Sequence, residues 1–318
     1  MYDVVGLSIL VVVILVFAAL AVWSWRARRG WVKLTGGIPT TLLAVLGIVV
    51  LVLAVRGFMR IDRTYSNPVA NVTVASSPER IATGEKFARV CTGCHSSNGQ
   101  LPLGGQAFFG GAGGPPFGTL WAPNLTPTHL GTWSDGEIIR AIREGVGKDG
   151  RSLVIMPSEA FHGLSDDDVQ SLVAYLRSQP AIQPDSPGKA LNILAALTIA
   201  SSDAAYTAQS PISGPVTAPP VGATPQYGDY LTRVVGCRSC HGANLQGAIP
   251  PGSDTGVMSP NLVDFAKNVS ADQFISTLRT GKTPTGYVLN PEEMPWRDFE
   301  KFSDDDFRAI YSYLTAPQ

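Results

Sequence analysis

The sequence predicts an all-α protein in which a two-helix membrane hairpin precedes two small helical domains of similar design. Three observations lead to this prediction: two uncharged apolar segments lie at the N-terminus, a Cys-x-x-Cys-His motif occurs twice in the remainder, and similar helical stretches surround both copies. A chain of 318 residues has room for such a division. We expect a hairpin at 1–60, a linker at 61–76, a first domain at 77–181, a Pro-, Ala- and Ser-rich linker at 182–223 and a second domain at 224–318.

Both N-terminal segments are apolar enough to cross a bilayer. Val4–Trp25 and Ile38–Val55 contain no charge in 22 and 18 residues, and a transmembrane helix needs about 17–25. The stretch RARRGWVK between them is positive, and short positive loops stay in the cytoplasm. Everything after residue 60 should therefore lie outside the bacterial cytoplasmic membrane. A cleaved signal peptide is the alternative for the first segment, but its start, MYD, lacks the positive charge that such a peptide needs.

The charge balance excludes a nucleic-acid partner. The chain has 24 Lys and Arg against 25 Asp and Glu, and no basic stripe runs along the sequence. A nucleic-acid-binding domain would instead show clustered positive charge. Charged residues make up 15% of the chain, below the usual quarter of a soluble protein, and the shortfall is concentrated in the apolar N-terminus.

All four cysteines lie in the two motifs, CTGCH at 91–95 and CRSCH at 237–241. A reactive dithiol and a zinc site are two possible interpretations, but Cys-x-x-Cys-His is also the attachment signal for c-type haem. In that chemistry both thiols bond covalently to the haem vinyl groups, and the next residue gives its imidazole to the iron. The candidate residues are Cys91, Cys94, His95, Cys237, Cys240 and His241.

A haem that only transfers electrons needs a sixth ligand, and Met is the usual partner of His in cytochromes c. Met156 lies 61 residues after His95, and Met294 lies 53 residues after His241. Both are followed by Pro, which favours an extended residue before it and suits a ligand-bearing loop. A zinc site would not require such a methionine. The sequence therefore predicts two covalently attached haem c groups, each with His/Met axial ligation.

The helical stretches around the two motifs repeat. The first pair begins with an N-cap and Pro, the second begins with a capping box and ends at Gly, and the third is amphipathic. Met156 and Met294 are 138 positions apart, which is also the spacing of the third pair of stretches. Met258 instead corresponds to Trp121, so we expect it to line the wall near the haem edge rather than to bind iron. The matching stretches are SPERIATGEKFARV with TPQYGDYLTRVVG, SDGEIIRAIREG with SADQFISTLRTG, and LSDDDVQSLVAYLRS with FSDDDFRAIYSYLTA.

Two further segments carry local predictions. The first copy has a surplus stretch, GGQAFFGGAGGPPFGTLW, which its Gly content predicts to be a loop. In the linker, KALNILAALTIA is expected to form one short helix across a domain face, too short to span a membrane. His129 and His162 have no counterparts in the second copy, so we expect surface or supporting positions for them. Trp121, Trp133 and Trp296 could line a haem or form plain core.

Residues 77–318 resemble the class I cytochrome c family. PPFGTLWAPNLTP, GTWSDGEIIRAIREGVGKDGR and HGLSDDDVQSLVAYLRSQP are similar to the cytochrome subunits of bacterial membrane-bound alcohol, aldehyde and gluconate dehydrogenases, which usually carry three haems and a C-terminal anchor. The order of hairpin and two haem domains is similar to the dihaem subunit of cbb3-type oxidases, without its DNPLPRWW-like stretch. The resemblance implies haem-binding residues at Cys91, Cys94, His95, Met156, Cys237, Cys240, His241 and Met294.

The expected function is electron relay on the outer face of the membrane, as a subunit of a respiratory or photosynthetic complex. The expected partners are a membrane redox complex (an oxidase, a quinol-oxidising complex, a reaction centre or a dehydrogenase) and a soluble electron carrier. The alternative is a haem enzyme, such as a dihaem peroxidase or a sulfur-compound oxidase. Such an enzyme needs an open iron or an unusual sixth ligand, whereas a methionine is available in both copies.

Overall fold

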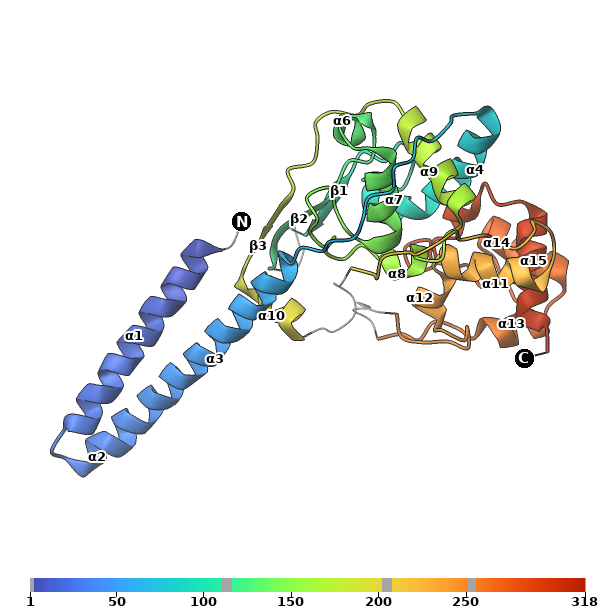
Figure 1. Cartoon of the computed structure of the whole chain (residues 1–318). Coiled ribbons are helices and arrows are strands. Elements are labelled where there is room, and N and C mark those ends of the chain that lie inside the picture. Colours follow the sequence, from blue (N-terminus) through green and yellow to red (C-terminus); the bar gives the residue numbers. More distant parts are fainter. Residues whose placement is uncertain (1–2, 110–115, 202–207, 251–255, 318) are drawn as a thin grey trace.

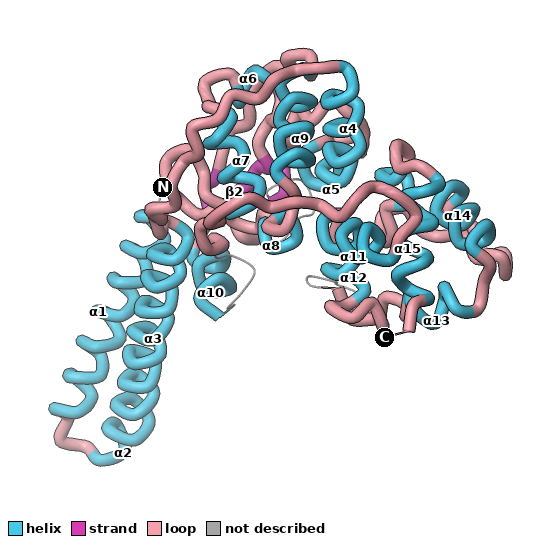
Figure 2. The backbone as a smooth tube through the Cα atoms, turned by 45° about the vertical axis from the view of Figure 1, so that its right-hand side comes forward, coloured by secondary structure: helices cyan, strands magenta, loops and turns pink. Residues whose placement is uncertain are grey.

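The computed structural model describes residues 3–109, 116–201, 208–250 and 256–317, and it is mainly helical, as the sequence predicts. A long two-helix arm leads into a first helical domain, and a second helical domain lies beside the first, away from the arm (Figure 1). Figure 2, turned by 45°, shows the same arrangement. The chain is therefore built as an arm and two domains.

The arm consists of two helices long and apolar enough to cross a membrane, Val4–Arg26 and Gly30–Ile61. The turn between them is shorter than the stretch RARRGWVK, because the first helix extends to Arg26 and the chain is helical again from Gly30. The second helix contains a π-helical turn, where hydroxyl groups of Thr40 and Thr41 donate to the carbonyls of Gly36 and Gly37 at 2.6 and 2.7 Å. The elements are α1 (Val4–Arg26), α2 (Gly30–Val32), η1 (Lys33–Gly37) and α3 (Ile38–Ile61).

The first domain packs its first helix, α4, against its last, α9. The helix starts form as the sequence predicts: the Ser77 hydroxyl accepts from the Arg80 amide, and Ser134 and Glu137 form a capping box. The elements are α4 (Pro78–Ala88), η2 (Arg89–Cys91), α5 (Thr92–His95), β1 (Gln106–Phe109), β2 (Gly118–Ala122), α6 (Pro127–Leu130), α7 (Asp135–Glu144), α8 (Ser158–Phe161) and α9 (Asp166–Ser178).

The second domain repeats this plan, with α11 packed against α15. Thr224 caps α11, and Ser270 and Gln273 form the second capping box. Gly145 and Gly281, which end the two matching helices, have the same left-handed φ of 66°. The elements are α11 (Pro225–Val234), α12 (Cys237–His241), α13 (Leu262–Lys267), α14 (Ala271–Thr280), η3 (Trp296–Phe299) and α15 (Asp304–Thr315).

A glycine allows the first and last helices of each domain to meet backbone to backbone. A Cβ atom on Gly84 would lie 1.9 Å from the carbonyl oxygen of Ser171, and one on Gly228 would lie 2.0 Å from that of Ala309. Neither neighbour is a side chain that can turn away. The close crossing is therefore a repeated feature, since Ser171 and Ala309 correspond at the offset of the last helices.

Replacing Gly84 or Gly228 with Val should destabilise the altered domain by about 3 kcal/mol or more, because overpacking against backbone forces the two helices apart. The measurement is denaturant unfolding followed by circular dichroism. Gly163→Ala is the control, since a Cβ atom there meets nothing within 4 Å. Equal unfolding midpoints for the valine variants and the control would contradict the role of the crossing.

The expectation that the surplus stretch of the first domain is loop is wrong for its two ends. β1 and β2 pair antiparallel, and β3 (Lys189–Leu191), which comes from the linker, pairs antiparallel with β2. The aromatic and β-branched residues of QAFF and GTLWA favour strands, and the surrounding glycines hid that signal. Residues 110–115 lie outside the described part of the chain.

The short helix expected in the linker forms, as α10 (Ile193–Ser201), but it packs against α3 rather than across a domain face. Figure 1 shows α10 beside the end of the arm. Gly57 permits this close approach, since a Cβ atom there would lie 1.9 Å from the carbonyl oxygen of Ala196. Buried apolar side chains of α3, β2, β3 and α10 form one cluster: Phe58, Ile61, Leu120, Leu191, Ala195 and Ala196.

The first domain is also joined to the arm by polar contacts. The Lys189 ammonium lies 3.6 Å from the Asp62 carboxylate, and the Tyr65 amide donates to the carbonyl of Gly150 at 2.8 Å. These contacts lie where α3 ends and the first domain begins. The first domain is therefore the one that sits on the membrane arm.

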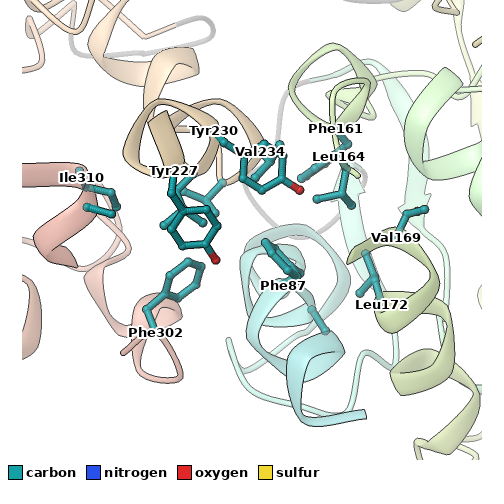
Figure 3. Close-up of a cluster of buried hydrophobic side chains, with 14 of the residues drawn as sticks. Phe87, Phe161, Leu164, Val169, Leu172, Tyr227, Tyr230, Val234, Phe302 and Ile310 are labelled. Atoms are coloured by element: carbon teal, nitrogen blue, oxygen red, sulfur yellow. The ribbon is translucent and has the colours of Figure 1, made fainter. Parts of the chain in front are cut away.

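The hydrophobic cores of the two domains are continuous. Figure 3 shows Phe87 of α4 facing Tyr227 of α11 and Phe302. The rings of Phe87 and Phe302 meet edge to face with centroids 6.4 Å apart. The Lys86 ammonium lies 3.4 Å from the carboxylate of Asp306, which is buried. The two domains thus share an interface that is both apolar and ion-paired.

Candidate cofactor sites

Each Cys-x-x-Cys-His motif lies in a short helical segment that follows the first helix of its domain. In the first domain α4 continues through η2 into α5, so Cys91, Cys94 and His95 lie on consecutive turns. In the second domain Gly236, with φ 80°, separates α11 from α12, which carries Cys237 to His241. The two motifs therefore have the same local geometry, reached through different connections.

A cavity of about 410 Å³ in the first domain brings the predicted residues together. Cys94, His95 and Met156, which are distant in sequence, all line it. Its walls are mostly aliphatic and aromatic, and its polar lining includes Asp149, Arg151 and Lys189. Cys91 does not line the cavity, but it packs against the hydrophobic core in the same attachment turn. An apolar space with one sulfur, one imidazole and one thioether at its edge fits a haem.

The two histidines have equivalent hydrogen bonds. The Nδ1 atom of His95 lies 2.8 Å from the carbonyl oxygen of Pro123, and that of His241 lies 2.9 Å from the carbonyl oxygen of Pro260. A carbonyl oxygen only accepts, so Nδ1 carries the proton and donates in both rings. Burial lowers the pKa of both imidazoles, which favours the neutral form. The lone pair of Nε2 is then available to iron, and the carbonyl fixes the ring.

The two Met-Pro segments form the same tight turn. Pro157 has φ −79° and ψ 56°, and Pro295 has φ −77° and ψ 58°, close to an inverse γ-turn. The amide two residues after each methionine donates to the methionine's carbonyl oxygen, at 2.8 Å for Met156 and 2.7 Å for Met294. This repeated geometry was not predicted, although the shared Met-Pro sequence was its signal.

Backbone strain immediately precedes the first of these methionines. Ile155 has φ 69°, which is unfavourable for a β-branched residue. Its side chain packs against the cluster that includes Phe58 and Ile61 at the end of α3. The membrane arm therefore helps to hold the Met156 turn in place. Sequence reasoning missed this, because nothing local to VIMP indicates a left-handed residue.

The cysteine environments do not suit a reactive dithiol. Burial raises the pKa of the Cys91 and Cys237 thiols to about 12, so unmodified thiols would stay protonated. Dithiols that exchange disulfides need a lowered pKa instead. Among the described residues no group of three or more His, Cys, Asp or Glu side chains could hold a metal ion. The buried thiols of Cys91 and Cys237 therefore do not favour thiol redox chemistry.

The remaining candidates fall into two groups. His129, Trp121 and Trp133 line the first cavity, and the His129 Nδ1 atom lies 2.9 Å from the Asp185 carboxylate. His162 is not among the residues that line it. Its Nδ1 atom lies 3.0 Å from the Arg143 carbonyl oxygen. Trp296 packs on Gly281 in the second domain, where a Cβ atom would lie 2.3 Å from the indole.

The mouths of the two sites differ in exposure. Gly145 and Gly281 correspond, so Ser152 of the first cavity corresponds to Val288, and both positions form an isolated β-bridge with matching partners. Ser152 is 3% exposed, whereas Val288 is 67% exposed. Met258, which corresponds to the half-buried Trp121, is 65% exposed. The rim of the second site is thus apolar and exposed at these two positions, where the first domain has a buried or half-buried residue.

Two regions of the chain match known protein families. Residues 81–180 match the cytochrome c family, and residues 225–314 match the family described as cytochrome C oxidase, cbb3-type, subunit III. The chain is 31% identical to one subunit of the nicotinate dehydrogenase of Pseudomonas putida, over 71% of its own length and 20% of that protein. It is 28% identical to the fructose dehydrogenase cytochrome subunit of Gluconobacter japonicus, over 72% of the chain and 50% of that protein.

A further relative is the cytochrome c subunit of the quinone-dependent alcohol dehydrogenase of Gluconacetobacter polyoxogenes, 27% identical over 78% of the chain and 59% of that protein. The chain thus spans between a fifth and about 59% of these relatives.

Proposed function

Because the chain contains two cytochrome c domains, which imply covalently bound haem c, we propose that it is a membrane-anchored dihaem electron-relay protein. The proposed domains are 77–181 and 224–318, joined by the linker at 182–223 and preceded by the hairpin and the linker at 61–76. When bound, the haem groups supply reversible one-electron transfer. The protein contributes attachment, ligation and shielding from water.

The observation that carries the proposal is the first cavity, which gathers Cys94, His95 and Met156 on apolar walls. The proposed role of the cysteines is thioether attachment, and that of the histidines and methionines is axial ligation. The fixed Nδ1 hydrogen bonds and the two Met-Pro turns support the same roles in the second domain. The proposed residues are Cys91, Cys94, His95 and Met156 for the first haem, and Cys237, Cys240, His241 and Met294 for the second.

We place both domains on the outer face of the cytoplasmic membrane, anchored by two transmembrane helices. Arg26, Arg28, Arg29 and Lys33 gather at the closed end of the hairpin, and short positive loops stay in the cytoplasm. The N-terminus and both domains lie toward the opposite end of the arm (Figure 1). Since the first domain packs on α3, its haem is the one nearer the membrane.

The proposed partner is a membrane dehydrogenase complex for which the chain is the electron outlet. The relatives named above are subunits of dehydrogenases, and electron-transfer subunits carry cofactors rather than substrate sites. The exposed apolar side chains of Met258, Tyr287 and Val288 form an open rim where we expect a redox protein to dock near the second haem. The weak net charge of −1 favours apolar docking over long-range steering.

Native membranes, gently solubilised and separated on a native gel stained for haem, test this assignment. We expect the chain to migrate with a dehydrogenase, and reduction of its haems when that enzyme's substrate is added. Migration with an oxidase, or alone at the mass of the chain, would overturn the dehydrogenase partner. Binding of carbon monoxide to either haem of the native protein would favour a haem enzyme instead, since an electron-transfer site with two axial ligands has no open position.

A further inference from the structure

The first haem-attachment turn is in direct contact with the second domain. Thr92, which lies between the two cysteines of the first motif, is 2% exposed. Its hydroxyl lies 2.9 Å from the Oδ1 atom of Asp298 and 2.8 Å from the carbonyl oxygen of Arg89, so its one proton is shared between the two acceptors. Asp298 belongs to η3, four residues after Met294 and within the segment that continues the Met-Pro turn. One hydrogen bond thus joins the attachment turn of one site to the methionine segment of the other.

Contacts on both sides of this bond hold it in place. The Arg89 guanidinium lies 3.3 Å from the Glu300 carboxylate, and the Lys301 ammonium lies 3.3 Å from the Glu85 carboxylate. Beyond them is the aromatic contact of Phe87 with Phe302 that Figure 3 shows. The Thr92–Asp298 bond is therefore flanked by an interface that spans both domains.

Among the described residues, the Thr92–Asp298 contact has no counterpart between the second motif and the first domain. The residue that corresponds to Thr92 in the second motif is Arg238, and its guanidinium is bonded within its own domain, to Asp229 and to the Tyr313 hydroxyl at 2.7 Å. The residue that corresponds to Asp298 in the first domain is Ala160, which has no side-chain acceptor. The two copies therefore differ at both positions of the contact. The hydrogen bond joins the first motif to the methionine segment of the second domain.

We propose that Thr92 and Asp298 are positioning residues for electron transfer between the two sites, with the first attachment turn held against the second methionine segment. The inference rests on the proposed function. In the step they serve, one electron passes across the junction from the reduced site to the oxidised site, and no bond is made or broken. Because the first domain sits on the arm and the second has the open rim, the chain forms a fixed series: membrane side, first site, junction, second site, partner.

The test uses the full-length protein in detergent, with Thr92→Val and Asp298→Ala, which each remove one half of the hydrogen bond. The readouts are the rate of electron redistribution between the haems after partial flash reduction, and amide hydrogen exchange across α5 and η3. We expect the rate to fall severalfold, and exchange in these segments to rise by about tenfold, as loss of a hydrogen bond to a carboxylate would allow. Haem content and both reduction potentials should stay as in the unaltered protein.

Conservative variants separate positioning from general damage. Thr92→Ser and Asp298→Asn keep a donor and an acceptor, so both should retain the original rate. Asp304→Ala is the matched control, because Asp304 pairs with Arg279 inside the second domain. An unchanged rate and unchanged exchange in Asp298→Ala would overturn the junction. That result would leave the proposed function standing, whereas a chain without two haems in its unaltered form would remove the function itself.

Discussion

Replacing Cys91 and Cys94 together with Ala should reduce the covalently bound haem of the chain from two groups to one. The measurement is the mass of the intact protein, in which each covalent haem adds its own increment. Replacing Cys237 and Cys240 is the matched variant, and it should leave one haem in the first domain instead. The two variants distinguish haem attachment from a zinc site or a disulfide, because neither of those adds the mass of a haem.

The first pair of substitutions should also unfold the first domain. A cavity of about 410 Å³ would lose its filling, and at about 24 cal/mol per Å³ the cost approaches 10 kcal/mol as an upper bound. Whole domains are stable by only about 5–15 kcal/mol. Limited proteolysis should therefore cut the altered chain first within 77–181. Two haems in either variant, or a resistant first domain in the first, would contradict the proposed attachment.

The repeated parts of the fold were predictable because they depend on local chemistry. Capping boxes, glycine helix ends and Met-Pro pairs act within a few residues, so the same letters give the same structure in both copies. The histidine of each motif could likewise be identified, although the carbonyl that orients it could not. Pro123 and Pro260 lie in the similar stretches APNL (122–125) and SPNL (259–262), yet only the fold brings their carbonyls to the rings.

The parts that join the copies to each other and to the arm were not predictable. β1 and β2 come from a stretch whose glycines conceal its aromatic residues, and their third strand is supplied by the linker. The apolar α10 was expected on a domain face, but it packs on α3 because Gly57 leaves room for its backbone. The Thr92–Asp298 contact spans 206 positions. Such contacts have no local signal, since each residue alone is an ordinary polar side chain.

Substituting the methionines of the second domain should separate the iron ligand from a wall residue. Met294→Ala should lower the reduction potential of the second haem by an amount on the order of 0.1 V or more, because axial ligands set haem potentials over a range of about 0.8 V. The altered site should also bind carbon monoxide in its reduced form, since an open position replaces the thioether. Potentiometric titration followed by the visible spectrum measures both effects.

Met258→Ala is the matched control, because Met258 is the only other methionine of the second domain. Met258 is 65% exposed and corresponds to Trp121, whereas Met294 lies in the same turn as Met156. We therefore expect Met258→Ala to leave the potential and the carbon monoxide response unchanged, and Met156→Ala to reproduce the Met294 effect at the first site. If Met258→Ala opened the second iron and Met294→Ala did not, the ligand would be Met258, and the correspondence between the two Met-Pro turns would be structural only.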